Sequence, residues 1–230
     1  MIRQRVMEFA ARQILASCTV LPLLGAQAAP VPGYPVAPRP LPEAEEIALA
    51  MSAAPTEISS RADVYVLRAT GFVRVRTGTN GCACLVGRDL HQGSRYPICF
   101  DQEGTRTIMM REMKEGALRA TGMSEAAVVR AVDAAFTSGE LRRPLRPAMA
   151  YMMSPRQVLF SSPFADGFLV GAWSPHVMIT LEGARPEQFG LARDSKVDVI
   201  SMDHQGERFA ELVVKVPKWS DGTPVAAARP

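Results

Sequence analysis

The sequence predicts an α+β fold, built as a mostly antiparallel sheet with two central helices in a single domain. Strand-like segments rich in β-branched and aromatic residues fall into two groups, within residues 62–100 and 168–216. Between these groups lie two segments whose apolar residues recur at helical spacing. Because strands and helices do not alternate regularly along the chain, we expect an antiparallel rather than a parallel sheet.

The first 28 residues have the features of a secretory signal peptide. Arg3, Arg5 and Arg12 give this segment a cationic start. The apolar run over 14–26 is shorter than the roughly 20 residues of a membrane-spanning helix. Small residues follow this run, so we expect cleavage after Ala28. The mature chain is then an exported soluble protein, periplasmic or secreted, with no transmembrane segment.

Two alternatives to cleavage stay open. The string Leu15-Ala16-Ser17-Cys18 resembles the lipobox of bacterial lipoproteins, in which a lipid on Cys18 would anchor the chain. Alternatively, the leader is retained as an uncut N-terminal anchor.

Cleavage also changes the charge of the protein. Loss of Arg3, Arg5, Arg12 and Glu8 leaves 23 basic and 22 acidic residues, which is a net charge of +1. Nucleic-acid binding normally requires a basic stripe. The densest basic cluster of this chain is Arg142, Arg143 and Arg146, interrupted by prolines, and it is typical of a solvated loop. We therefore expect no nucleic-acid partner, and the sequence leaves the actual partner unknown.

The folded region is expected to begin after a proline-rich tether. Residues 29–42 contain six prolines, which fix φ and cannot donate backbone hydrogen bonds, so this segment should be extended and disordered. A short helix is predicted over 43–53, because acidic residues precede its apolar residues. One α+β domain over 43–220 and a frayed tail over 221–230 complete the expected organisation.

Strand and helix signals follow in order along this domain. Alternating residues over 73–76 and 82–86 flank the turn-forming segment 77–81 and predict a hairpin, and a strand follows over 96–100. Helices are predicted over 105–120 and from Ser124 to Gly139, and a short one over 154–160. The remaining predicted strands cover 168–173, 176–181, 197–202 and 209–216, and a turn at 203–206 joins the last two.

Three cysteines remain after cleavage, and an exported protein is expected to use them in a disulfide. Cys82 and Cys84 lie two residues apart on one predicted strand and so face the same side. Cys99 can therefore pair with Cys84 or with Cys82, closing a loop of about 15 residues that stabilises by roughly 3 kcal/mol. The odd number of cysteines leaves one thiol free.

The free thiol keeps two chemical hypotheses open. Cys82, Cys84 and Cys99 with His91 form a possible Cys₃His set for a soft metal, zinc or copper. Alternatively, the Cys82–Cys84 pair is redox-active and exchanges a disulfide. Two methionine clusters, at 109–113 and 149–153, could also serve copper, although helical spacing favours packing for the first. We predict no cofactor.

Enzymatic chemistry is the other alternative. His176 follows Trp173 at the start of a predicted strand, and with Cys99 as nucleophile it would make a Cys–His hydrolase. No sequence pattern brings these two residues together, so a structural histidine is favoured. We expect a binding or structural module rather than an enzyme. A thiol- and histidine-dependent enzyme or metal-handling protein using Cys82, Cys84, Cys99 and His176 is the alternative.

Three strings resemble those of a group of uncharacterised exported bacterial proteins. They are Asn80-Gly81-Cys82-Ala83-Cys84-Leu85-Val86, Tyr151-Met152-Met153-Ser154 and Pro175-His176-Val177-Met178. The resemblance covers about residues 70–181 and implies export, but it brings no activity with it.

Overall fold

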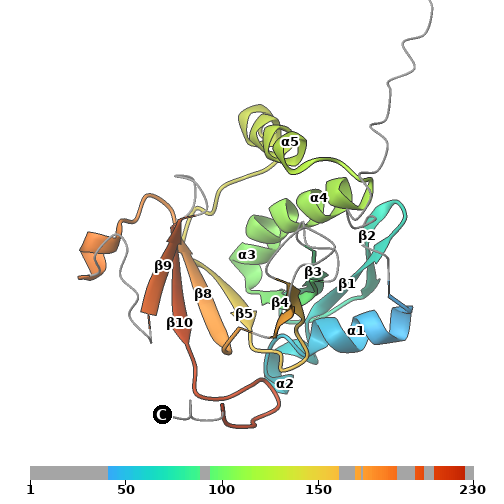
Figure 1. The fold of residues 1–230 in the computed structure, drawn as a ribbon, viewed down its shortest axis with the longest axis vertical. Coiled ribbons are helices and arrows are strands. Elements are labelled where there is room, and N and C mark those ends of the chain that lie inside the picture. Colours follow the sequence, from blue (N-terminus) through green and yellow to red (C-terminus); the bar gives the residue numbers. More distant parts are fainter. Residues whose placement is uncertain are drawn as a thin grey trace, which may run out of the picture. The chain divides into compact units, whose positions relative to one another are not determined.

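The computed structural model describes residues 41–88, 94–160, 169–171, 173–190, 200–204 and 210–225. The expected signal peptide, nearly all of the proline-rich segment and His91 lie outside these ranges. Within them, one eight-stranded sheet has the order β2-β1-β3-β4-β5-β8-β10-β9 (Figure 1). Its strands are β1 (Asp63–Arg68), β2 (Gly71–Arg76), β3 (Ala83–Gly87), β4 (Tyr96–Phe100), β5 (Ala148–Met152), β8 (His176–Leu181), β9 (Ile200–His204) and β10 (Ala210–Lys215).

Every neighbouring pair in this sheet is antiparallel except β1 and β3. The helices of the described chain are α1 (Glu43–Met51), α2 (Thr56–Ser59), α3 (Gln102–Arg106), α4 (Ile108–Ala120) and α5 (Glu125–Ser138), with a 3₁₀ turn, η1 (Pro186–Phe189). The predicted α+β class with a mostly antiparallel sheet is confirmed.

The central helices follow the sequence signals closely. The predicted helix over 105–120 is divided at Thr107, whose backbone is not helical (φ −129°, ψ −78°), so α3 and α4 are separate. Helix α5 begins after Ser124 and ends at Gly139, which has the left-handed conformation (φ 79°) that favours glycine.

The predicted hairpin between 73–76 and 82–86 is wrong. Strand β2 instead turns back onto β1, with Gly71 (φ 111°) opposite Arg68. The chain then crosses β1 to its other side, because Asp63 accepts the N–H of Gly78 (2.6 Å) and donates its own N–H to the carbonyl oxygen of Cys82 (2.8 Å). As a result β3 lies parallel to β1, on the side away from β2.

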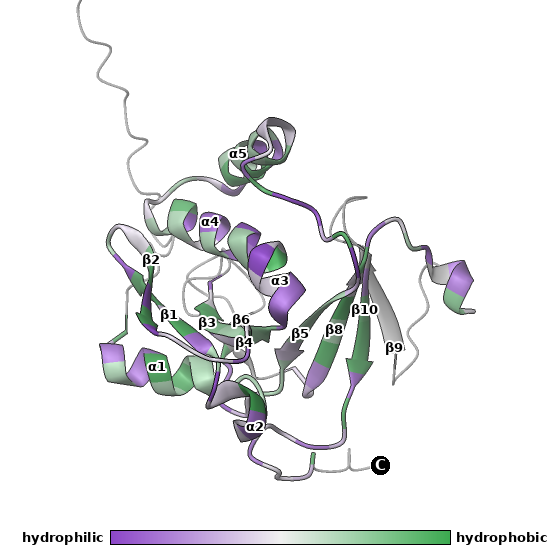
Figure 2. Cartoon of the chain, turned by 180° about the vertical axis from the view of Figure 1, so that it is seen from behind, coloured by the Kyte–Doolittle hydropathy of each residue, from purple (hydrophilic) through white to green (hydrophobic). Residues whose placement is uncertain are grey.

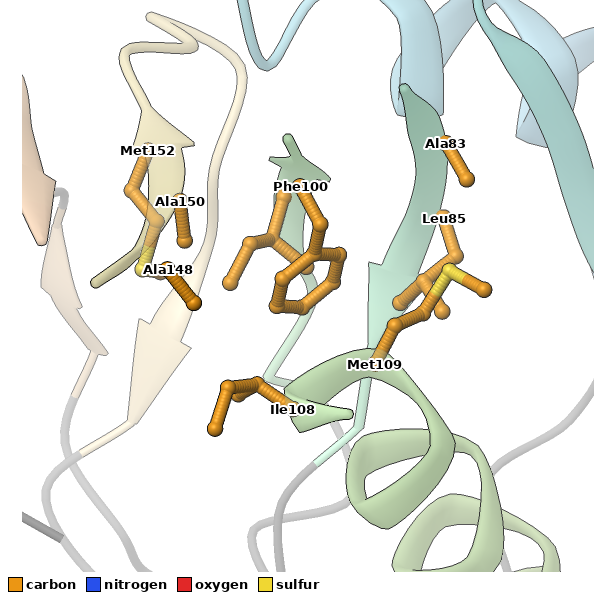
Figure 3. Close-up of a cluster of buried hydrophobic side chains, with 9 residues drawn as sticks. Ala83, Leu85, Phe100, Ile108, Met109, Ala148, Ala150 and Met152 are labelled. Atoms are coloured by element: carbon orange, nitrogen blue, oxygen red, sulfur yellow. The ribbon is translucent and has the colours of Figure 1, made fainter. Parts of the chain in front are cut away.

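One face of the sheet packs against α3 and α4. Figure 3 shows the ring of Phe100 between the β5 side chains and Leu85, with Ile108 and Met109 reaching towards them from α4. Strands β4 and β5 pair over only two residue positions. The buried side chains of this cluster therefore join the two halves of the sheet where the hydrogen-bonded ladder is short.

Helices α1 and α2 cover the opposite face. Alternate residues of a strand point to opposite sides, so Cys84 and Val86 of β3 contact the α1 cluster while Ala83 and Leu85 belong to the α4 cluster. Along α1, hydrophobic residues alternate with hydrophilic ones (Figure 2), as expected for a helix with one buried side.

The C-terminal strands follow their sequence signals in part, because Asp203 and His204, predicted to lie in a turn, belong to β9 and pair with β10. Strands β9 and β10 pair antiparallel, which confirms the predicted hairpin partners. The predicted short helix over 154–160 is wrong, because the hydroxyl of Ser154 accepts the N–H of Arg156 (3.1 Å) and Val158 pairs with Arg95. Residues 159–160 form β6 (Leu159–Phe160), which pairs with β7 (Leu169–Gly171) in a separate two-stranded sheet.

Among the described residues, no helix combines the length and the hydrophobicity that a membrane span needs. The start of the tail that we expected to fray, 221–225, is held in a turn in which Trp219 donates its N–H to the carbonyl oxygen of Thr223 (2.9 Å).

Candidate functional site

Cys84 and Cys99 are bonded to each other across β3 and β4. The antiparallel register places them directly opposite, with a Cα–Cα distance of 4.0 Å. Cys82 lies two residues from Cys84 on the same face, just before β3, and extending the register one step beyond Ala83–Phe100 brings it opposite Asp101 rather than Cys99. Such a diagonal neighbour is farther from Cys99 than a disulfide spans. Of the two pairings that the sequence left open, the structure therefore contains Cys84–Cys99.

The bonded pair is fully enclosed. Neither cysteine is exposed to solvent, and the Cys99 sulfur lies 3.8 Å from the carbonyl oxygen of Ala50 on α1. A buried, bonded sulfur is neither a thiolate nucleophile nor a metal ligand. The arrangement is that of a structural cross-link beneath α1.

Among the cysteines in the described ranges, Cys82 has the free thiol, and it is half-buried. Its pKa is raised, first by burial and then by the carboxylate of Asp101, and Arg61 offsets only part of this. The side chains of Cys82, Asp101 and Tyr151 are close enough to act on one another, because the pKa of Tyr151 is raised by burial and by both other groups. This environment keeps the thiol protonated, which is the opposite of what redox exchange requires.

A metal site formed by the cysteines and His91 is not seen in the described ranges. His91 itself lies outside them, and within them no three His, Cys, Asp or Glu side chains are grouped in a way that could hold an ion. The first methionine cluster divides as its spacing predicted, with Met109 buried in the core and Met110 exposed.

His176 is buried beside Trp173. Its Nδ1 lies 2.7 Å from the carbonyl oxygen of Ser174, and the two rings meet edge to face with centroids 6.0 Å apart. Burial lowers the pKa of His176; the hydrogen bond with Ser174 opposes this shift, and the nearby charge of Lys215 adds to it. The imidazole is therefore a neutral, hydrogen-bonded group of the interior.

His176 and Cys99 lie on opposite faces of the sheet. His176 pairs with Met152 on β5, whose side chain belongs to the α4 cluster. Cys99 pairs with Tyr151, the neighbouring residue, whose side chain belongs to the α1 cluster. Since adjacent strand residues point to opposite sides, the Cys–His pair considered from the sequence does not meet.

A buried ion pair that no sequence pattern predicted joins α1 to the residue after β3. Glu46 and Arg88 are 3.1 Å apart, and their side chains are 0% and 1% exposed. Glu46 also accepts the N–H groups of Leu67 (3.0 Å) and Leu41 (3.2 Å). Burial lowers the pKa of Arg88, although Glu46 opposes this shift. No local signal predicts this contact, because its partners lie 42 residues apart.

A second charged cluster does have a local signal. Arg111, Glu115 and Arg119 recur every four residues on α4, so they lie on one side of the helix. Glu115 contacts both arginines, and Arg119 also binds Glu125 of α5 at 2.8 Å. Burial alone would lower the pKa of Arg119, but its hydrogen bond to Glu125 and the nearby acidic groups raise it. The contact between Arg119 and Glu125 ties α4 to α5.

An open groove lies between the loop after α5 and the loop after β8. Its volume is about 370 Å³. Pro144, Leu145 and Pro147 line it from the first loop, and Leu181, Ala184 and Phe189 line it from the second. We call it the Leu145 groove. The side chain of Leu145 is 97% exposed and that of Phe189 is 40% exposed, so its apolar lining continues onto the surface.

Glu103 anchors the first loop to α3. This largely buried α3 carboxylate accepts the N–H of Leu145 (3.0 Å) on one oxygen and contacts Nε of Arg146 (3.1 Å) with the other. The hydrogen bond from Leu145, followed by those from the arginines, lowers the pKa of Glu103 despite burial. Glu103 therefore stays ionised, and the backbone that carries Leu145 is anchored.

Arg143 links the same loop to the second loop and to α5. Its guanidinium lies 3.3 Å from Glu182 on the second loop and 5.8 Å from the centre of the Phe136 ring on α5. The connection from α5 to β5 is largely hydrophilic (Figure 2), in keeping with the basic loop that the sequence predicted. The sequence does not mark the exposed Leu145 within it, since a single leucine among arginines and prolines carries no periodic signal.

Comparison of the chain with models of known protein families, with curated protein sequences and with solved structures gave no match.

Proposed function

We propose that this chain is an exported binding domain that recognises a partner at the Leu145 groove. The observation that carries the proposal is a contrast within one residue. The backbone N–H of Leu145 is fixed by Glu103, whereas its side chain is almost entirely in solvent. An apolar side chain exposed in this way adds nothing to the stability of the fold, but a partner that covers it would gain binding energy.

The energetic gain on binding supports this role. Covering a leucine side chain stabilises a complex by about 2 kcal/mol, which corresponds to roughly a 30-fold change in affinity. A loop that is already anchored loses little conformational entropy on binding, so more of this gain is retained. Phe189 and the groove beside it extend the apolar contact area.

The sulfur chemistry favours binding over the thiol-dependent alternative. Of the three cysteines that follow residue 28, two form a structural disulfide and the third, Cys82, is in an environment that raises its pKa. The histidine considered as a catalytic partner lies on the other face of the sheet from Cys99.

The binding proposal is tested by comparing two exposed apolar residues. Leu145→Ala removes the displayed side chain, and Val73→Ala on β2 removes one that is 43% exposed near the other edge of the sheet. Each tagged variant is produced in the natural host and its associated proteins are quantified by mass spectrometry. We expect a partner retained by the wild type and by Val73→Ala and depleted about tenfold or more by Leu145→Ala. Equal enrichment with both variants would overturn the proposal.

Export is the other half of the proposal and rests on the leader and the disulfide. Disulfides persist in oxidising compartments. An intact mass of the natural protein that starts at Ala29 and lies two hydrogens below the reduced form is the expected result. A chain that starts at Cys18 and carries added lipid would assign it to the membrane surface, and a full-length reduced chain in the cytosol would refute export.

A further inference from the structure

The Leu145 groove is lined by the charged residues Arg146 and Glu182 as well as by apolar ones, while Arg142 and Arg185 lie on the same two loops without lining it. Its two loops, residues 142–147 and 181–190, contain four arginines against two glutamates. Arg143 and Arg146 are held by Glu182 and by buried Glu103. In the part of the chain that the structure describes, the exposed Arg142 and Arg185 have no carboxylate partner. Glu187 is the remaining exposed acid on these loops, so after these pairings the loops keep an excess of one positive charge.

We infer that the occupant of the Leu145 groove is an acidic segment of a partner protein, with carboxylates on either side of an apolar side chain. This inference rests on the proposed binding function and names the class of its partner. Carboxylates would meet the forked guanidinium groups of Arg142 and Arg185. The apolar side chain between them would enter the groove beside Leu145 and Phe189.

The shape of the surface favours a protein over a lipid bilayer. An exposed leucine next to a groove of about 370 Å³ presents a protrusion and a recess side by side. Protein interfaces match both features, since their central anchors fill pockets on the partner. A bilayer surface accepts a protruding side chain but supplies none to fill the groove.

The contacting segment can be identified by photo-crosslinking. The full chain is produced in its natural host with a benzophenone amino acid at position 145 or, as the control, at position 73. The adduct is isolated and its crosslinked peptide is sequenced by mass spectrometry. We expect a discrete protein adduct from position 145 alone, in a peptide with Asp or Glu flanking an apolar residue.

Charge reversal then tests the arginines with the identified partner. Arg142→Glu combined with Arg185→Glu is compared with Arg130→Glu combined with Arg156→Glu, which makes the same change in net charge at exposed arginines elsewhere. We expect the first pair to weaken binding at least tenfold and the second to weaken it less than threefold. Reversing the partner's acidic residues to lysine should restore binding to the first variant.

The possible outcomes separate this inference from the proposed function. A specific protein adduct whose peptide lacks acidic residues, or equal effects of the two charge reversals, overturns the acidic partner and leaves the binding function intact. No adduct specific to position 145 overturns both. Binding to phosphatidylglycerol vesicles that Leu145→Ala abolishes, without a protein adduct, would assign the surface to lipid and overturn the inference.

Discussion

Glu46 of α1 and Arg88 after β3 form an ion pair from which solvent is excluded on both sides. The carboxylate also accepts two backbone N–H groups, and the guanidinium donates to the carbonyl oxygen of Val86 (2.8 Å). The backbone groups are uncharged, so the counter-ion of each side chain in this pair is the other side chain. This contact joins the first helix to the central strands.

Removal of the Glu46 charge should lower the stability of the folded protein. Glu46→Gln leaves the buried guanidinium of Arg88 uncompensated, which typically destabilises a protein by about 3–5 kcal/mol. Urea unfolding followed by circular dichroism measures the change. Glu45→Gln alters the neighbouring exposed carboxylate and should change the free energy of unfolding by less than about 0.5 kcal/mol. Equal unfolding midpoints for the two variants would contradict the buried pair.

Loss of the Cys84–Cys99 bond should lower stability by about 3 kcal/mol, the value for a loop of this length. Replacing both cysteines by alanine removes the cross-link, and chemical denaturation gives the free energy of unfolding. Cys82→Ala is the matched control because it removes a cysteine that forms no bond. We expect Cys82→Ala to lower the free energy of unfolding clearly less than the double variant does. Equal losses in the control and the double variant would show that the bond itself contributes nothing.

The stability of the protein should depend on His176 below neutral pH. Burial lowers the pKa of His176 in the folded state, so the unfolded chain, with a histidine pKa of about 6.5, binds the proton more readily. Stability from this group is therefore present above about pH 6.5 and is lost as the pH falls from there towards the folded-state pKa. His176→Gln should flatten this part of the curve in urea titrations between about pH 5 and pH 7.5. A folded-state NMR titration of His176 with a midpoint at or above that of the unfolded chain would contradict the prediction.

Asp101 should control the reactivity of Cys82. Burial is the main cause of the raised pKa of this thiol and the Asp101 carboxylate is the second. Asp101→Asn removes the charge but keeps a side-chain oxygen that can cap α3, where Asp101 accepts the N–H of Gly104 (2.7 Å). We expect the pKa of Cys82 to fall and its alkylation by iodoacetamide at mildly alkaline pH to accelerate. Asp221→Asn alters an exposed carboxylate and should not change the alkylation rate of Cys82. An unchanged rate in Asp101→Asn would rule out the electrostatic contribution of Asp101.

Elements with strong local signals were predictable from the sequence. The bounds of β4 and β8 agree with the predicted segments, and α5 lies between the two residues expected to bound it. These signals are local because a cap, a left-handed glycine or an alternating strand depends on residues a few positions away. The signal peptide is a local pattern too, and it stays a prediction.

Errors arose where a local signal competed with a distant partner. The turn residues at 77–81 were consistent with a hairpin, but hydrogen bonds to Asp63 and Arg61 lead the chain across β1 instead. Ser154 resembled a helix cap, yet its hydroxyl closes a turn, and the following residues pair with Arg95.

The sequence by itself determined that this chain is an α+β protein with central helices, and that three cysteines follow residue 28. Only the tertiary structure decided that Cys84 rather than Cys82 bonds Cys99, that Glu46 meets Arg88, and that Cys99 and His176 lie on opposite faces. It also decided that Leu145 is displayed on an anchored loop. The physical reason is that strand register and long-range contacts arise from packing between segments far apart in the chain, which periodicity and spacing do not encode.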